Sequence, residues 1–208
     1  MAASGLDVGL VCFTHGGAST LGLEPARPGG LQQLRAEELA SAARVLGLSR
    51  VELLDYPDGG LEGVHLDELA GVVEKSATAM AAGAILVFDE GGITGHPDHR
   101  QATRAGLAAA ARVGIPALAW AITETVASAL NVEFGSTFVG RGDAEIQVWL
   151  KVDRRIQKEA ISCHRSQAEG NRVLWRRLEL SGSVEPLRLL GPQAADAPSP
   201  DQRPLANS

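Results

Sequence analysis

Aromatic residues are scarce in this chain of 208 residues, at 4% of the composition, although the hydrophobic share as a whole is 45%. A core of this kind has to be built mainly from small and aliphatic side chains, which suits helices packed in layers on a sheet. The length is sufficient to bury a full core and favours one domain over two.

Cysteine and long apolar runs are also lacking. The two cysteines, Cys12 and Cys163, lie in unrelated segments without a C-x-x-C pattern or a secretory leader ahead of them. This excludes a disulfide framework and predicts a reducing, cytoplasmic setting. No apolar run approaches the ~18–20 residues that a membrane-spanning helix needs.

The charge pattern excludes further classes. The net charge is −6, and the 19 Lys and Arg residues are scattered, so no basic stripe for nucleic acid is present. The nucleophile elbow G-x-S-x-G, the phosphate loop G-x-x-x-x-G-K-[ST] and the dinucleotide pattern G-x-G-x-x-G are all missing. Serine hydrolase, P-loop and dinucleotide-binding functions therefore lack their key residues.

What is present is an alternation of strand and helix patterns. Strands are expected at 6–14, 51–56, 84–89, 117–123 and 145–152, and helices at 33–48, 67–80, 100–114 and 153–167. Such alternation predicts an α/β fold with a parallel sheet covered on both faces. Gly47 is placed to end its helix in the left-handed conformation. Residues 191–208 are rich in Pro, Ala and polar residues, which predicts a disordered tail after a domain at 1–190.

The segment GHPDH at 95–99 offers the clearest candidate site. Pro97 suits the first position of a helix, and Asp98 suits the positive end of its dipole. These facts alone describe a capped helix with surface histidines. The functional alternative is that His96 and His99 flank the carboxyl end of the strand at 84–89, where open α/β sheets bind ligands. A helix N-terminus would keep His99 neutral and available to a metal such as zinc.

Two further polar residues have ordinary structural explanations. Asp58 stands in YPDGGL, where aspartate commonly forms a turn. His164 stands near the end of a polar helix, where a histidine often complements the dipole. From their local patterns alone, neither residue indicates a site.

Together, however, four segments resemble the PIG-L/LmbE-like family of zinc-dependent N-deacetylases. They are LRAEELASAARVLGLSRVELLDYPDGGL, TGHPDHRQATRAG, the stretch from LNVEFG through WLKVDRRIQKEAISCHRSQ, and NRVLWRRLEL. The resemblance implies a Rossmann-like three-layer α/β sandwich with a mostly parallel sheet. It also implies zinc-dependent removal of the acetyl group from a small N-acetylglucosamine-type conjugate.

The resemblance assigns roles residue by residue. His99 resembles the zinc ligand of the second motif, and His96 the histidine that stabilises the tetrahedral oxyanion, with Asp98 orienting or tuning it. Arg35 and Asp58 resemble residues that hold the sugar. His164 matches a motif residue with a structural or near-site role.

One family motif is missing. An H-P-D-D segment after the first strand should supply two more zinc ligands and the general base, whereas the only histidine before position 65 is His15, and Gly17 replaces the glutamate expected near it. The chain thus offers one of three zinc ligands. One hypothesis is a deacetylase whose first central strand and most of the following helix are absent from this sequence. The alternatives are a catalytically inactive member that binds a sugar or a protein, and an unrelated binding domain in which GHPDH is only a cap.

Overall fold

The computed structural model describes residues 5–17, 30–90 and 95–190. The strands are β1 Gly9–Cys12, β2 Arg50–Leu53, β3 Ile85–Phe88, β4 Ala117–Trp120, β5 Val148–Lys151 and β6 Val184–Leu190. The α-helices are α1 Gly30–Leu46, α2 Leu66–Ala79, α4 Pro97–Val113, α5 Glu124–Phe134, α6 Arg154–Cys163, α7 Arg165–Ala168 and α8 Arg172–Leu180. Two short 3₁₀ helices are η2 Leu61–Gly63 and η3 Asp143–Glu145.

The described strands form two sheets. β1 pairs in parallel with β2, and the second sheet has the order β3-β4-β6-β5. In that sheet β3 and β4 are parallel, whereas β6 runs antiparallel to both β4 and β5. The α/β class is confirmed, but "mostly parallel" holds only in part, because two of the four strand pairings are antiparallel.

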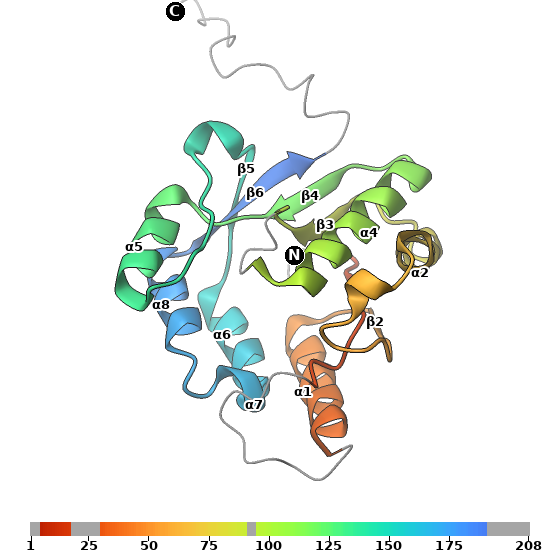
Figure 1. The fold of residues 1–208 in the computed structure, drawn as a ribbon, viewed down its shortest axis with the longest axis horizontal. Coiled ribbons are helices and arrows are strands. Elements are labelled where there is room, and N and C mark those ends of the chain that lie inside the picture. The colour runs from red at the N-terminus through yellow and green to blue at the C-terminus, as the bar shows by residue number, and fades with distance from the viewer. Residues whose placement is uncertain (1–4, 18–29, 91–94, 191–208) are drawn as a thin grey trace, which may run out of the picture.

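The strands of the two described sheets do not pair with one another. Parallel strands are normally buried on both faces within one continuous sheet. Here Leu86, in the middle of the apolar run of β3, is 49% exposed. The two parallel pairs are nevertheless held together, because α2 contacts β1 and packs along α4, which covers β3 (Figure 1).

A small hydrophobic core joins these elements. Phe13, Leu61, Leu69 and Ala105 form one buried cluster, in which Leu69 and Ala105 are fully buried. Deleting a leucine side chain from such a site costs about 2–5 kcal/mol of stability. The cluster packs the residue after β1, the short helix η2 and α2 against the middle of α4.

The helix boundaries confirm several local predictions. Pro97 is the first residue of α4 and His96 its N-cap. Gly47 has a φ of +68° and follows α1. α1 begins at Gly30, three residues before the expected start, which is within the usual uncertainty of helix ends read from a pattern.

Other elements differ from the prediction. The helix expected over 153–167 is two helices, α6 and α7, separated at His164, whose φ of −86° and ψ of 55° lie outside the helical region. The elements α5, α8 and β6 were not predicted; β6 pairs with strands far from it in sequence, a relationship that no local pattern encodes.

Two further predictions concern the C-terminal tail and membrane-spanning helices. The tail predicted at 191–208 lies outside the described residues. Among the described helices, none is both long enough and apolar enough to cross a bilayer.

Candidate functional site

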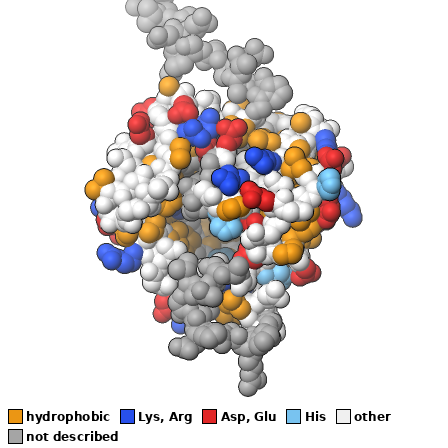
Figure 2. All heavy atoms as spheres, viewed as in Figure 1, with side chains coloured by type: hydrophobic (Ala, Val, Ile, Leu, Met, Phe, Trp, Pro, Cys, Tyr) orange, Lys and Arg blue, Asp and Glu red, His pale blue; other side chains and the backbone are white. Residues whose placement is uncertain are grey.

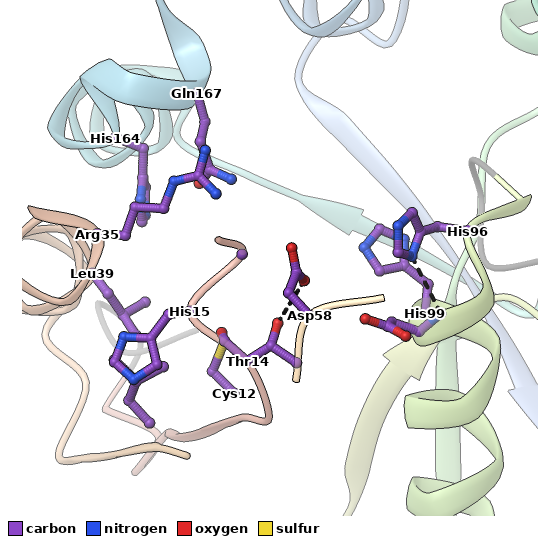
Figure 3. Close-up of a pocket in the computed structure, with 13 residues that line it drawn as sticks. Cys12, Thr14, His15, Arg35, Leu39, Asp58, His96, His99, His164 and Gln167 are labelled. Atoms are coloured by element: carbon purple, nitrogen blue, oxygen red, sulfur yellow. Dashed lines mark hydrogen bonds between the residues drawn. The ribbon is translucent and has the colours of Figure 1, made fainter. Parts of the chain in front are cut away.

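A cavity of about 350 Å³ opens between the β1–β2 side of the molecule and the start of α4. All six residues singled out from the sequence line it: Arg35, Asp58, His96, Asp98, His99 and His164. Figure 3 shows Arg35 and His164 on one side, Asp58 in the middle, and His96 and His99 on the other. Figure 2 shows histidine side chains in the hollowed centre of this face, where acidic and basic side chains are intermixed.

The position of His96 follows from the start of α4. As the N-cap residue, it accepts a hydrogen bond at Nδ1 from the backbone N–H of Asp98, with a distance of 3.2 Å. A helix start leaves its first N–H groups without partners within the helix, and this bond satisfies one of them. Since Nδ1 accepts, the neutral ring carries its proton on Nε2. His96 can therefore donate a hydrogen bond from Nε2.

His99 lies one turn further along α4. Its ring stacks on Phe88 of β3, with ring centroids 4.4 Å apart and an angle of 21° between the planes. The rings of His96 and His99 are neighbours, with centroids 5.3 Å apart. The carboxyl end of β3 and the beginning of α4 thus present two imidazoles side by side.

Asp98 is buried, and its carboxylate holds a turn. It accepts hydrogen bonds from the backbone N–H groups of Gly59, at 2.6 Å, and Leu61, at 3.1 Å. The contact between Asp98 and His96 runs through the backbone N–H of Asp98. Asp98 therefore joins the start of α4 to the turn after Tyr56, and it fixes which nitrogen of His96 is protonated.

Asp58 and Gly59 form the turn that Asp98 holds. Gly59 has a φ of +76°, a left-handed conformation that suits glycine. Asp58 accepts a hydrogen bond of 3.0 Å from the hydroxyl of Thr14, which follows β1. This bond places the Asp58 carboxylate at the carboxyl ends of the parallel pair β1–β2.

Arg35 reaches the cavity from the buried face of α1. It is 4% exposed, and burial lowers the pKa of its guanidinium, whereas the nearby charges of Asp58 and Glu38 oppose that shift. A Cβ atom on Gly16 would lie 2.8 Å from Nη1 of Arg35. The glycine therefore allows the loop after β1 to pass close to the guanidinium.

His164 and Gln167 complete the wall next to Arg35 (Figure 3). Burial lowers the pKa of His164, and the negative charge of Glu38 opposes that shift. Glu38 itself accepts two hydrogen bonds from Ser166, one from its backbone N–H and one from its hydroxyl. The histidine of H-R-S-Q is thus a cavity residue as well as a helix cap.

The lining residues that were not predicted as site residues include Thr14, His15 and Gln167. Thr14 and His15 directly follow β1, so the rule that ligands bind at the carboxyl ends of parallel strands could have found them. The His15 Nε2 atom lies 3.0 Å from a carboxylate oxygen of Asp55. Gln167 carries no comparable signal in the sequence.

The described residues do not fit a complete zinc centre. A catalytic zinc site uses three protein ligands and keeps a fourth position open. Among residues 5–17, 30–90 and 95–190, no three His, Cys, Asp or Glu side chains are grouped so that they could hold a metal ion. Asp98, the carboxylate nearest in sequence to His99, is occupied by two backbone amides.

The chain spans less than half the length of the curated relatives it matches. One is a 1D-myo-inositol 2-acetamido-2-deoxy-alpha-D-glucopyranoside deacetylase of Catenulispora acidiphila, which is 31% identical over 140 residues, covering 57% of this chain and 43% of the relative. A homologous deacetylase from Streptomyces scabiei is 32% identical over 138 residues, or 56% of this chain and 43% of that protein.

Solved structures share the fold at low sequence identity. The N,N'-diacetylchitobiose deacetylase of Pyrococcus horikoshii has a TM-score of 0.61 and 19% identity, covering 97% of this chain and 79% of that one. At this identity the likeness shows the fold alone. The model of the PIG-L family, described as GlcNAc-PI de-N-acetylase, matches residues 1–110, which is more than half of the sequence. The chain therefore belongs to the PIG-L family.

Proposed function

We propose that the cavity binds the N-acetylglucosamine unit of a sugar conjugate and that this chain serves its N-deacetylation. The observation that carries the proposal is that three side chains meet around one cavity. His96, whose Nε2 can donate a hydrogen bond, lies across the cavity from Arg35 and Asp58. Family membership supports it, and so do curated relatives whose names describe removal of the acetyl group from a glucosaminyl inositol.

The residues have complementary roles in this proposal. Arg35 donates hydrogen bonds and Asp58 accepts them, which suits the hydroxyl groups of a sugar. His96 donates from Nε2 to the acetamide oxygen and to the oxyanion that forms when water attacks the carbonyl. A donor placed where negative charge develops contributes about 10²–10³ in rate. Asp98 keeps His96 in the tautomer that can do this.

Amide hydrolysis also needs an activated water molecule. The family resemblance assigns this task to zinc, which lowers the pKa of a bound water. His99 is the ligand that the resemblance places in this chain, and the described residues do not assemble the other two. In this proposal, hydrolysis therefore depends on zinc ligands from outside the described residues. Sugar binding and hydrolysis must be tested separately.

The incomplete set of zinc ligands among the described residues, beside an intact cavity, favours a second candidate function. A family member with an incomplete donor set but an intact cavity would bind an N-acetylated sugar without hydrolysing it. In this candidate Arg35 and Asp58 would hydrogen-bond the sugar hydroxyls without help from a metal. This inactive module predicts sugar binding in the presence of a chelator and no release of acetate.

The experiment titrates the 208-residue chain with N-acetylglucosamine and with glucose, following ¹H–¹⁵N NMR signals. Binding of the acetylated sugar that is weakened by Arg35→Lys, but not by Arg44→Lys on the exposed face of α1, supports the cavity assignment. An acetate-release assay with added zinc then separates the two candidates. Equal response to both sugars, or no response, contradicts the proposal.

A further inference from the structure

The short helix α7 cannot hold its own shape. It has only four residues, Arg165–Ala168, and its N-cap residue His164 supplies no capping hydrogen bond from its side chain. Isolated helices of this length are unstable in water, and their first N–H groups need partners from elsewhere. Something outside α7 must fix the turn that carries His164 and Gln167.

That partner is Glu38, on α1. One of its carboxylate oxygens accepts a hydrogen bond of 2.8 Å from the backbone N–H of Ser166. The other accepts a hydrogen bond of 2.6 Å from the Ser166 hydroxyl. Both residues are buried, with 7% of Glu38 and 4% of Ser166 exposed. Hydrogen bonds to a charged and buried acceptor are stronger than those between neutral groups. The carboxylate therefore caps α7 from a helix that lies 128 residues earlier in the chain.

The contact between Glu38 and Ser166 also holds two residues of the cavity wall in place. The backbone N–H groups of Gln167 and Ala168 donate to the carbonyl of His164, at 2.9 and 2.8 Å, so Ser166 sits inside one hydrogen-bonded turn. His164 and Gln167, on either side of Ser166, both line the cavity. Arg35, which also lines it, lies one turn before Glu38 on the same buried face of α1.

We propose that Glu38 is a positioning residue: through Ser166 it fixes His164 and Gln167 against the cavity and in register with Arg35. The part of the proposal that concerns sugar affinity rests on the proposed function above. Neither Glu38 nor Ser166 lines the cavity, so any effect on a ligand passes through the residues that they hold.

The test compares Glu38→Ala, Glu38→Gln and the control Glu37→Ala, whose side chain is exposed on the same turn of α1. The side-chain NMR signals of His164 and Gln167 report their positions without any sugar, and a titration with N-acetylglucosamine gives Kd. Glu38→Ala should move both signals and raise Kd about tenfold, which corresponds to ~1.4 kcal/mol. Glu38→Gln keeps an acceptor for the Ser166 N–H, so its NMR signals and its Kd should lie between those of the wild type and Glu38→Ala. Glu37→Ala should change neither the signals nor Kd.

The outcomes separate the positioning role from the proposed function. Signals of His164 and Gln167 that stay unchanged in folded Glu38→Ala would overturn the positioning role, even if the melting temperature falls. Signals that move in a chain whose wild type binds no sugar would uphold positioning and overturn the proposed function alone. If Glu38→Ala does not fold, Ser166→Ala removes only the hydroxyl bond; smaller movements of the same signals support the role, and unmoved signals overturn it.

Discussion

The carboxylate of Asp98 accepts a hydrogen bond of 2.6 Å from the backbone N–H of Gly59, which ties the start of α4, with His96 and His99, to the turn that carries Asp58. A second bond, from the N–H of Leu61, makes the tie bidentate. The two motifs that flank α2 in the sequence are thus one structural unit in space. The strength of this unit can be tested directly.

Replacing Asp98 with Ala should lower the free energy of unfolding by about 2–4 kcal/mol, because the part-buried amide of Gly59 and the buried amide of Leu61 lose a charged acceptor. Asp98→Asn should cost less, because its amide oxygen can still accept one bond. Urea denaturation at neutral pH measures both. The control is Glu62→Gln, whose carboxylate is exposed and lies 3.5 Å from Arg100; it should change stability by less than ~0.5 kcal/mol. Equal losses in Asp98→Ala and Glu62→Gln would refute a structural role for the buried carboxylate.

The tautomer of His96 gives a second prediction. Because Nδ1 accepts the Asp98 N–H, the neutral imidazole should carry its proton on Nε2. Ring ¹⁵N chemical shifts, recorded under conditions where the imidazole is neutral, distinguish the two tautomers. His65, whose side chain makes no capping hydrogen bond at the start of α2, is the internal comparison. A proton on Nδ1 of His96 would contradict the proposed donor to the acetamide oxygen.

The start of α4 was predictable because its determinants are local. Pro at the first position, an acidic residue beside it and a glycine before them describe a helix start in any fold. The strand before it, an apolar run of β-branched and aliphatic residues, then places His96 and His99 at the carboxyl edge of the sheet. The same reasoning, applied to the end of β1, points to Thr14 and His15.

Long-range relationships explain what was not predicted. β6 enters the sheet antiparallel to β4, and the bonds between Glu38 and Ser166 join residues 128 positions apart. Nothing in the local pattern of 153–167 shows that His164 leaves the helical conformation, since the turn that follows it is also held by Glu38 of α1 through Ser166. Residue roles in that region therefore came from the family resemblance and not from periodicity.

Metal binding by the chain as it stands is a third prediction. With one expected ligand and no grouping of three among the described residues, the purified 208-residue chain should hold well below one zinc per molecule after dialysis. Elemental analysis measures this, with His99→Ala as the matched variant. One zinc per chain in the wild type, lost in His99→Ala, would contradict the prediction and show that ligands outside the described residues complete the site.

The last prediction concerns acid stability, through the buried carboxylate of Glu185 on β6. Trp120 donates to it from Nε1 over 2.8 Å, Arg177 lies 3.4 Å away, and Arg154 also donates to it. Burial alone would raise the pKa of Glu185, but the hydrogen bonds from Arg154 and Trp120 and the charge of Arg177 outweigh burial and lower it.

A carboxylate whose pKa is lower in the folded state stabilises the protein above its unfolded pKa of about 4.3, and this stabilisation is lost as the pH falls through the folded value. Glu185→Gln should therefore be less stable than the wild type at pH 7, where it leaves the buried guanidinium of Arg177 and the part-buried guanidinium of Arg154 without their carboxylate. Between about pH 5 and pH 3 its stability should fall less steeply than that of the wild type. Urea unfolding at several pH values measures both slopes. Glu159→Gln, on the exposed side of α6, is the control and should keep the wild-type slope; an unchanged slope in Glu185→Gln would show that this carboxylate does not couple stability to pH.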